Sequence, residues 1–184
     1  MTSKVILTLP LFLMVVGCAA NKAVTPPPQP ESPPQQPPAA APTQPAGSGL
    51  KLDLPAGWER SVPPEGTMEG IESVVKNESL QSVILVALYL TKEMSPAENA
   101  AMMATTLRKN GVQTTEISIA PDGLSASFDW NNLSNGMAGK MTSIVLKDVP
   151  QVSAMFMGVW PGMVESAAAP DFDAVVASAH VSNK

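Results

Sequence analysis

The sequence predicts an α+β domain in which a largely antiparallel β-sheet is packed by two main helices. Two observations lead to this fold class. Apolar and polar residues alternate in several segments joined by short turns, which is typical of antiparallel strands with one buried face. Helical periodicity, by contrast, is found in only two places, in the middle of the domain and near its C-terminal end.

The beginning of the domain is predicted to be β-structure. Residues 50–54 alternate leucine with charged residues, which predicts a half-buried strand that ends at the turn Pro55–Gly57. A second strand is expected over Met68–Val75. The unbroken apolar run Val83–Leu90 predicts a central strand covered on both faces, with a buried helix segment as the alternative reading.

The first helix is predicted from its ends. Ser95, Pro96 and Glu98 form a capping box with proline at the first helical position. Asn110-Gly111 predicts the end of this helix. Between these signals the apolar residues recur at helical spacing, and they are Ala100, Met103, Ala104 and Leu107.

The second half of the domain is expected to add four strands and a helix. The strands are predicted over Thr115–Ala120, Leu124–Trp130, Met137–Lys147 and Gln151–Trp160, separated by turns at Pro121–Gly123, Asn135–Gly136 and Asp148–Pro150. In the second of them, alternation places Leu124, Ala126, Phe128 and Trp130 on one face. The last helix is predicted to begin near Pro170, and its apolar face would hold Phe172, Val175, Val176 and Ala179.

Residues 1–17 have the pattern of a signal peptide. Lys4 is followed by the apolar run Val5–Val16, which is shorter than the roughly 20 residues that a spanning helix needs. Val15–Cys18 resembles the bacterial lipobox, in which an aliphatic residue, a small residue and glycine precede the modified cysteine. The resemblance implies that Cys18 becomes the first residue of the mature chain and carries diacylglyceryl and N-acyl groups. An ordinary signal peptide with a chance cysteine is the alternative.

Residues 18–48 are predicted to be a disordered tether before the globular domain at 49–184. Ten of the 19 prolines lie between Pro26 and Pro45, and this segment shows no apolar periodicity. Proline favours the polyproline II conformation, so the Pro-rich stretch Thr25–Ala46 of the tether is expected to be a semi-rigid spacer with a reach of roughly 70 Å.

The motif Leu52–Trp58, together with the capped helix after Ser95 and the order of the elements, resembles the PsbP-like family, which includes DcrB-type bacterial lipoproteins. The resemblance implies an α/β/α sandwich over most of residues 50–181. It also implies an accessory or assembly role, because the members of that family are mostly non-catalytic.

The sequence contains no recognisable catalytic motif. His180 is the single histidine and has no paired motif, so we expect it to be structural or exposed. The carboxylate pairs Glu69/Glu72 and Asp171/Asp173 would serve a hydrolase only if two carboxyl groups faced each other across a cleft. We therefore predict that the chain is not an enzyme and has no cofactor or metal, with a small acid-dependent hydrolase as the alternative.

The methionines and the tryptophans each allow two interpretations, a role in the core or a role in binding. The 11 methionines include Met102-Met103, Met137/Met141 and Met155/Met157, whose thioethers could hold Cu(I), although flexible core filling is their usual role. Trp58, Trp130 and Trp160 are expected in the core, with the lining of a groove as the alternative.

These observations predict a lipoprotein of the cell envelope that is anchored to a membrane through Cys18. Its location would be the outer membrane, facing the periplasm, if the organism is Gram-negative. The net charge of −5 argues against nucleic acid as a partner, since nucleic-acid binding needs clustered positive charge. The expected partner is another envelope protein, and a purely structural spacer is a further alternative.

Overall fold

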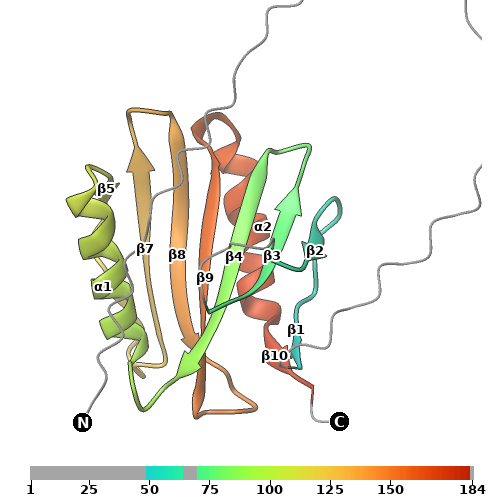
Figure 1. The fold of residues 1–184 in the computed structure, drawn as a ribbon, viewed down its shortest axis with the longest axis vertical. Coiled ribbons are helices and arrows are strands. Elements are labelled where there is room, and N and C mark those ends of the chain that lie inside the picture. Colours follow the sequence, from blue (N-terminus) through green and yellow to red (C-terminus); the bar gives the residue numbers. More distant parts are fainter. Residues whose placement is uncertain (1–48, 64–69, 183–184) are drawn as a thin grey trace, which may run out of the picture. The chain divides into compact units, whose positions relative to one another are not determined.

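An eight-stranded antiparallel sheet dominates residues 49–63 and 70–182, the part of the chain that the computed structural model describes (Figure 1). Cys18, the predicted signal peptide, the tether and Glu69 lie outside these residues. The elements are β1 (Leu50–Lys51), β2 (Glu59–Ser61), β3 (Ile71–Asn77), β4 (Ser82–Leu90), α1 (Pro96–Lys109), β5 (Gln113–Thr114), β6 (Ser118–Ile119), β7 (Ser125–Asn132), β8 (Met137–Val145), β9 (Val152–Pro161), the 3-10 turn η1 (Gly162–Val164), α2 (Glu165–Ser178) and β10 (His180–Val181).

The strands of the large sheet follow the order β2-β3-β4-β9-β8-β7-β5, and β6 also pairs with β7. Every pair is antiparallel, and the longest ladders join β4 to β9, β9 to β8 and β8 to β7. β1 and β10 form a separate two-stranded ribbon that brings the two ends of the domain together. The predicted fold class, an α+β domain with a largely antiparallel sheet and two main helices, is therefore confirmed.

The two helices cover opposite faces of the sheet. Lys140 on β8 reaches Asp173 on α2, with 2.8 Å between Nζ and Oδ1. Ser143, three residues further along β8, instead contacts Asn99 on α1. Because successive side chains of a strand point to opposite faces, α2 lies on the side of the even-numbered residues of β8 and α1 on the other side.

The core between the sheet and α2 consists of aromatic and aliphatic side chains. Trp160 and Phe172 meet edge to face, with their ring centroids 5.9 Å apart. The buried members of this core are Leu50, Trp58, Val75, Ile84, Val86, Ala138, Leu146, Ala154, Phe156, Trp160, Ala168, Phe172 and Val175. No methionine is among them.

The first helix matches its prediction in detail. The Ser95 hydroxyl accepts a hydrogen bond from the Glu98 amide, and the Glu98 carboxylate accepts one from the Ser95 amide, which completes the capping box. The helix ends at Lys109, and Gly111 follows with a φ of 78°. All four predicted stripe residues are buried: Ala100, Met103, Ala104 and Leu107.

The second helix begins earlier than predicted. α2 begins at Glu165, so Pro170 lies inside the helix instead of opening it. Ala168, which precedes the proline, is fully buried in the core. Packing of this turn against the sheet outweighs the local preference of proline for the first helical position.

Several strands also differ from their predictions. The first strand ends at Lys51 rather than at Leu54, and β2 was not predicted at all. The run Val83–Leu90 is a central strand, but only its even-numbered face is deeply buried, because α1 lies over other strands. Leu124 precedes β7 and is 51% exposed, so it does not share the buried face of Phe128.

Among the described residues, no helix combines the length and the apolar character that crossing a bilayer would require.

Candidate functional site

Methionines gather on the side of the sheet that faces α1. Met141 on β8 and Met157 on β9 are direct cross-strand partners, so their side chains emerge next to each other. Met155 precedes Met157 by two residues and therefore shares its face. Met103 reaches the same side from α1, which packs against β7 and β8. We call these four residues the methionine cluster.

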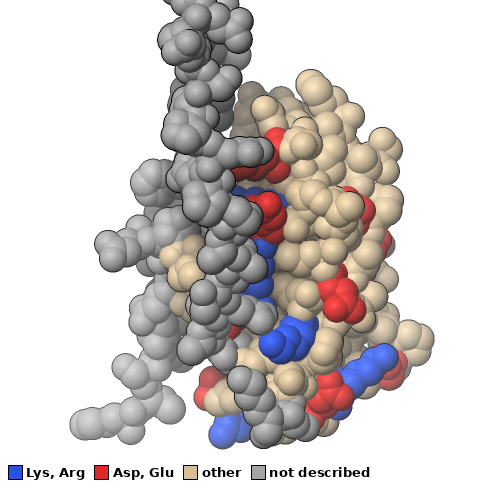
Figure 2. Space-filling model, turned by 90° about the vertical axis from the view of Figure 1, so that its right-hand side faces the viewer, with Lys and Arg blue, Asp and Glu red and all other residues tan. Residues whose placement is uncertain are grey.

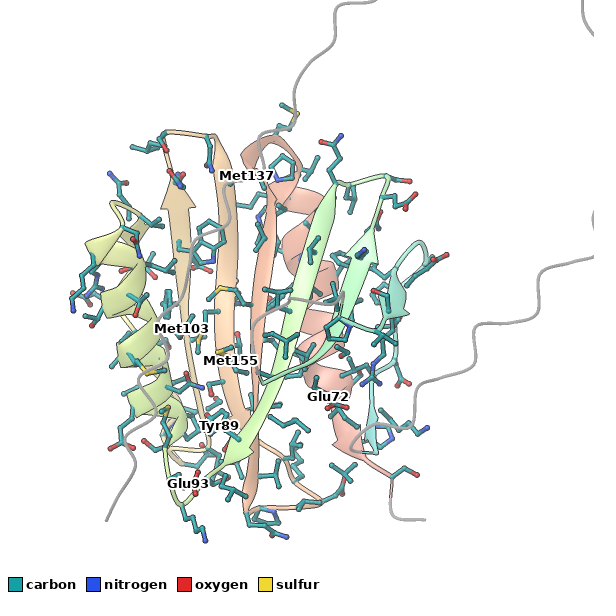
Figure 3. The ribbon with its side chains drawn as sticks, viewed as in Figure 1. Glu72, Tyr89, Glu93, Met103, Met137 and Met155 are labelled. Carbon is teal, nitrogen blue, oxygen red and sulfur yellow. The ribbon has the colours of Figure 1, made fainter. Side chains whose placement is uncertain are left out.

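The methionine cluster runs from the interior to the surface. Met103, Met141 and Met157 are buried, whereas Met155 is half-buried. Figure 3 labels Met103 on α1 and Met155 on β9. The cluster thus offers several thioether sulfurs with one of them close to solvent.

A polar group borders the methionine cluster. Ser143, the cross-strand partner of Met155, is fully buried and shares a hydrogen bond with the Tyr89 hydroxyl. Asn99 approaches the same serine, with 3.5 Å between Nδ2 and Oγ, while its Oδ1 has no hydrogen-bond partner among the described residues. This side of the sheet therefore combines thioether sulfurs with buried polar groups.

A second notable region is an apolar tip formed by Leu133 and Met163. Leu133 lies in the β7–β8 turn and is 69% exposed, and Met163 lies in η1 and is 91% exposed. The two turns are joined by a hydrogen bond of 2.9 Å from the Gly162 amide to the Gly136 carbonyl. In Figure 1 they lie at the end of the domain opposite β1 and β10.

The carboxylates singled out from the sequence have separate structural partners. Asp171 accepts a hydrogen bond from the indole of Trp58, at 2.7 Å from Nε1 to Oδ2. Asp173 forms the ion pair with Lys140. Glu72 lies 3.9 Å from a guanidinium nitrogen of Arg60. The structure therefore does not bring Asp171 and Asp173 together as a pair of opposed acids.

His180 lies on β10 and is exposed. Its Nδ1 is 2.9 Å from the carbonyl oxygen of Ser178, which lies two residues earlier. No carboxylate or hydroxyl contacts its ring within the part of the chain that the structure describes. The side chain is thus exposed and held to its own backbone, as expected from its isolation in the sequence.

The tryptophans are all largely buried. Trp58 and Trp160 belong to the core under α2. Trp130 lies on the other side of the sheet, where its ring would meet a Cβ atom on Gly139 at 2.4 Å. This arrangement agrees with the expectation of core packing and leaves no aromatic groove of these three residues.

Acidic and basic residues both line the β2–β3 edge of the sheet. A cleft of about 390 Å³ is lined there by Gly57, Glu59, Arg60, Ser61, Lys76, Glu78 and Ser79. Figure 2 shows Lys and Arg interspersed with Asp and Glu on this side of the molecule. Within the described ranges no three His, Cys, Asp or Glu side chains form a group that could hold a metal ion. The cleft has no dominant charge that would select a ligand.

Sequence reasoning did not find the apolar tip. Leu133 stands among polar residues in the turn Asn132–Gly136. An apolar residue in such a polar turn could have indicated an exposed apolar side chain. Met163 could not have been connected with it, because only the β8–β9 pairing brings the two turns together.

Comparison with known proteins finds similarity in structure only. No family model matches the chain, and no curated protein does. The solution structure of cyanobacterial PsbP (CyanoP) from Synechocystis sp. PCC 6803 aligns with a TM-score of 0.51 and 15% identity, covering 73% of this chain and 87% of that one. The domain has the PsbP-like fold. The fold implied by the motif at Leu52–Trp58 is thereby confirmed.

A second neighbour shares the PsbP-like fold. The crystal structure of the Ran-binding protein Mog1p from Saccharomyces cerevisiae aligns with a TM-score of 0.51 and 13% identity, covering 72% of this chain and 90% of that one. At such identities the likeness establishes the PsbP-like fold and transfers no residue roles.

Proposed function

We propose that this chain is a lipid-anchored lipoprotein of the cell envelope whose PsbP-like domain binds another envelope protein and does not catalyse a reaction. Cys18 would carry the diacylglyceryl and N-acyl groups. In a Gram-negative organism the protein would be held at the outer membrane and would face the periplasm.

The observation that carries the binding role is the apolar tip. Leu133 and Met163 are the most exposed large apolar side chains of the described residues, and the hydrogen bond from Gly162 to Gly136 joins the two turns that carry them. Exposed apolar side chains that gather at one end of a domain are typical of protein contact sites. The tip lies at the end of the domain opposite β1, the first strand (Figure 1).

Two further facts support a binding role. Asp171, Asp173 and Glu72 each contact a structural partner, which leaves the acid-dependent hydrolase without an arranged pair of these carboxyls. One of the proteins with a similar fold is described as Ran-binding, which is a binding activity. The partner expected here is a protein that offers an apolar pocket to the tip.

The binding role can be tested by photo-crosslinking in the native cells. A photoreactive amino acid at position 133 or 163 of the full chain is expected to yield a discrete crosslinked protein. The same group at Lys147, in the β8–β9 loop at the other end of the sheet, is the matched control. Crosslinks of equal yield from position 147, or none from the tip, would refute the proposed contact surface.

The anchor can be tested separately on Cys18. Metabolic labelling with a fatty-acid analogue is expected to mark the wild-type chain, and Cys18→Ser is expected to lose both the label and the membrane association. A labelled Cys18→Ser chain, or an unlabelled wild-type chain, would refute lipidation at this residue.

A further inference from the structure

The methionines are not distributed evenly between the two sides of the sheet. Every buried methionine of the described residues, namely Met103, Met141 and Met157, lies on the side that faces α1. The core under α2 is larger and contains aromatic, aliphatic and alanine side chains but no methionine. All the buried thioethers of the described residues therefore lie within one side of the sheet.

The strand register concentrates the thioethers further. Met141 and Met157 occupy one cross-strand pair, and Met155 occupies the next pair on the same face, opposite Ser143. Directly opposed Cβ atoms lie about 5 Å apart, and diagonal neighbours about 7–8 Å, which flexible methionine side chains can span. Asn99 lies at Ser143, so Met103, one helical turn further along α1, falls near Met141.

We propose that the methionine cluster binds a single Cu(I) ion through the thioether sulfurs of Met103, Met141, Met155 and Met157. Thioethers are soft ligands and select Cu(I) over the hard divalent ions. No cluster of His, Cys, Asp and Glu occurs among the described residues, so the structure offers no competing site for Zn²⁺ there.

Access and charge are consistent with this assignment. Thioethers are neutral, so a bound Cu(I) ion would keep its positive charge, and a cation buried without compensation is costly. Met155 is half-buried and brings the cluster to the surface, where solvent lowers this cost and the ion can enter. The neighbouring hydroxyl groups of Tyr89 and Ser143 add oriented dipoles at the same place.

The test is an anaerobic titration of the full chain with Cu(I) against a chromogenic Cu(I) chelator. The wild-type chain is expected to withdraw one equivalent from the chelator, and Zn²⁺ is expected not to compete. Met155→Leu and Met157→Leu are each expected to weaken binding by about tenfold or more, equivalent to about 1.4 kcal/mol. Met102→Leu, an exposed methionine of α1 outside the cluster, is the matched control and is expected to bind as the wild type does.

Each result decides the proposal. Failure of the wild-type chain to withdraw Cu(I), or binding by both cluster variants as tight as that of the wild type, would overturn it. Met→Leu nearly conserves volume, and circular dichroism checks that each variant is folded. If Met157→Leu does not fold, the result for the more exposed Met155→Leu decides.

NMR signals of the methionine methyl groups give a second readout, since Cu(I) should shift those of the cluster and not that of Met163. The result does not depend on the envelope partner, so failure here leaves the proposed function standing.

Discussion

Asp171 and Asp173 stand two residues apart on α2 and yet make different kinds of interaction. Asp171 accepts a hydrogen bond from the buried indole of Trp58, whereas Asp173 forms an ion pair with Lys140 near the surface. Removal of an acceptor from a buried donor leaves that donor without water and without a partner. Removal of one member of a surface ion pair changes little, because water screens both charges.

We therefore predict that Asp171→Ala destabilises the fold by about 1.5–3 kcal/mol. Asp173→Ala, the matched control, is expected to cost about 0–1 kcal/mol. Urea unfolding followed by tryptophan fluorescence measures both. Equal losses for the two variants would show that the Trp58 hydrogen bond contributes no more to stability than the Lys140–Asp173 ion pair does.

Gly158 shows a second constraint at the scale of one residue. A Cβ atom at this position would lie 2.4 Å from Cζ3 of Trp160 and 2.7 Å from Cδ2 of Phe172. Both rings are buried, so neither can move aside without disturbing the core. The absence of a side chain at Gly158 is what lets the two rings lie against the strand.

Gly158→Ala is accordingly predicted to destabilise the fold by about 1–3 kcal/mol through overpacking. Gly162→Ala is the control: it is exposed, and its Cβ would meet only the Gly136 carbonyl oxygen, at 3.3 Å. Its effect is expected to stay within about 0.5–1 kcal/mol. Thermal unfolding compares the two, and a smaller loss for Gly158→Ala than for Gly162→Ala would contradict the packing argument.

At the scale of the element, the start of α1 depends on a carboxylate. The Ser95 amide donates a hydrogen bond of 2.8 Å to the Glu98 carboxylate, and the Ser95 hydroxyl donates a second. These bonds favour the charged form and lower the pKa of Glu98 below its ordinary value of 4.5, the backbone bond having the larger effect. A lowered pKa in the folded state stabilises the protein above the unfolded-state pKa, and this stabilisation is lost as the pH falls through the folded-state pKa.

The stability difference between the wild type and Glu98→Gln should therefore be largest above pH 4.5 and should shrink as the pH falls below it. Glutamine keeps the geometry of the cap, so the comparison isolates the charge. Urea unfolding at several pH values measures the difference. In a Ser95→Ala background the pH dependence should become smaller but remain, because the amide of residue 95 still donates to the carboxylate. A difference that stays constant with pH would refute the assignment.

The elements whose signals are local were the ones that the sequence predicted well. The capping box at Ser95 and the alternation before Trp130 act within a few residues, and both α1 and β7 form where expected. β2 was missed because Glu59–Ser61 has no apolar alternation, and its strand conformation depends on pairing with β3. The start of α2 was misplaced because contacts of Ala168 across the chain, rather than Pro170, decide it.

The residues of the methionine cluster could be predicted from the sequence, but their arrangement in space could not. Alternation along β8 and β9 predicts which methionines share a face within each strand. The pairing of Met141 with Met157 depends on the register of the hairpin, and the approach of Met103 depends on which face α1 covers. Both are properties of the assembled sheet, and no local pattern encodes them.

At the scale of the whole molecule, the ribbon of β1 and β10 joins the two ends of the described domain. Leu50 pairs with Val181, and the Leu50 side chain is buried in the core under α2. Deletion of residues 180–184 removes the partner strand of Leu50. Loss of this burial is predicted to cost about 1.5–3 kcal/mol, as expected for a large apolar side chain.

His180→Ala is the control for this deletion, because it keeps the strand and removes only an exposed ring. Its effect on thermal unfolding is expected to stay within about 0.5 kcal/mol. A deletion that is as mild as His180→Ala would show that the ribbon does not contribute to the stability of the domain.

The same ribbon determines how the domain responds to mechanical tension. Pulling on the chain that enters at Gly49 loads first the Gly49–Ser182 hydrogen bond and the two residue pairs of β1 with β10. So short a ladder peels open under less force than the long ladders of β4, β9 and β8. Each released residue lengthens the chain by about 3.3 Å while the large sheet stays closed. The β1–β10 ribbon is therefore expected to open under tension before the large sheet does.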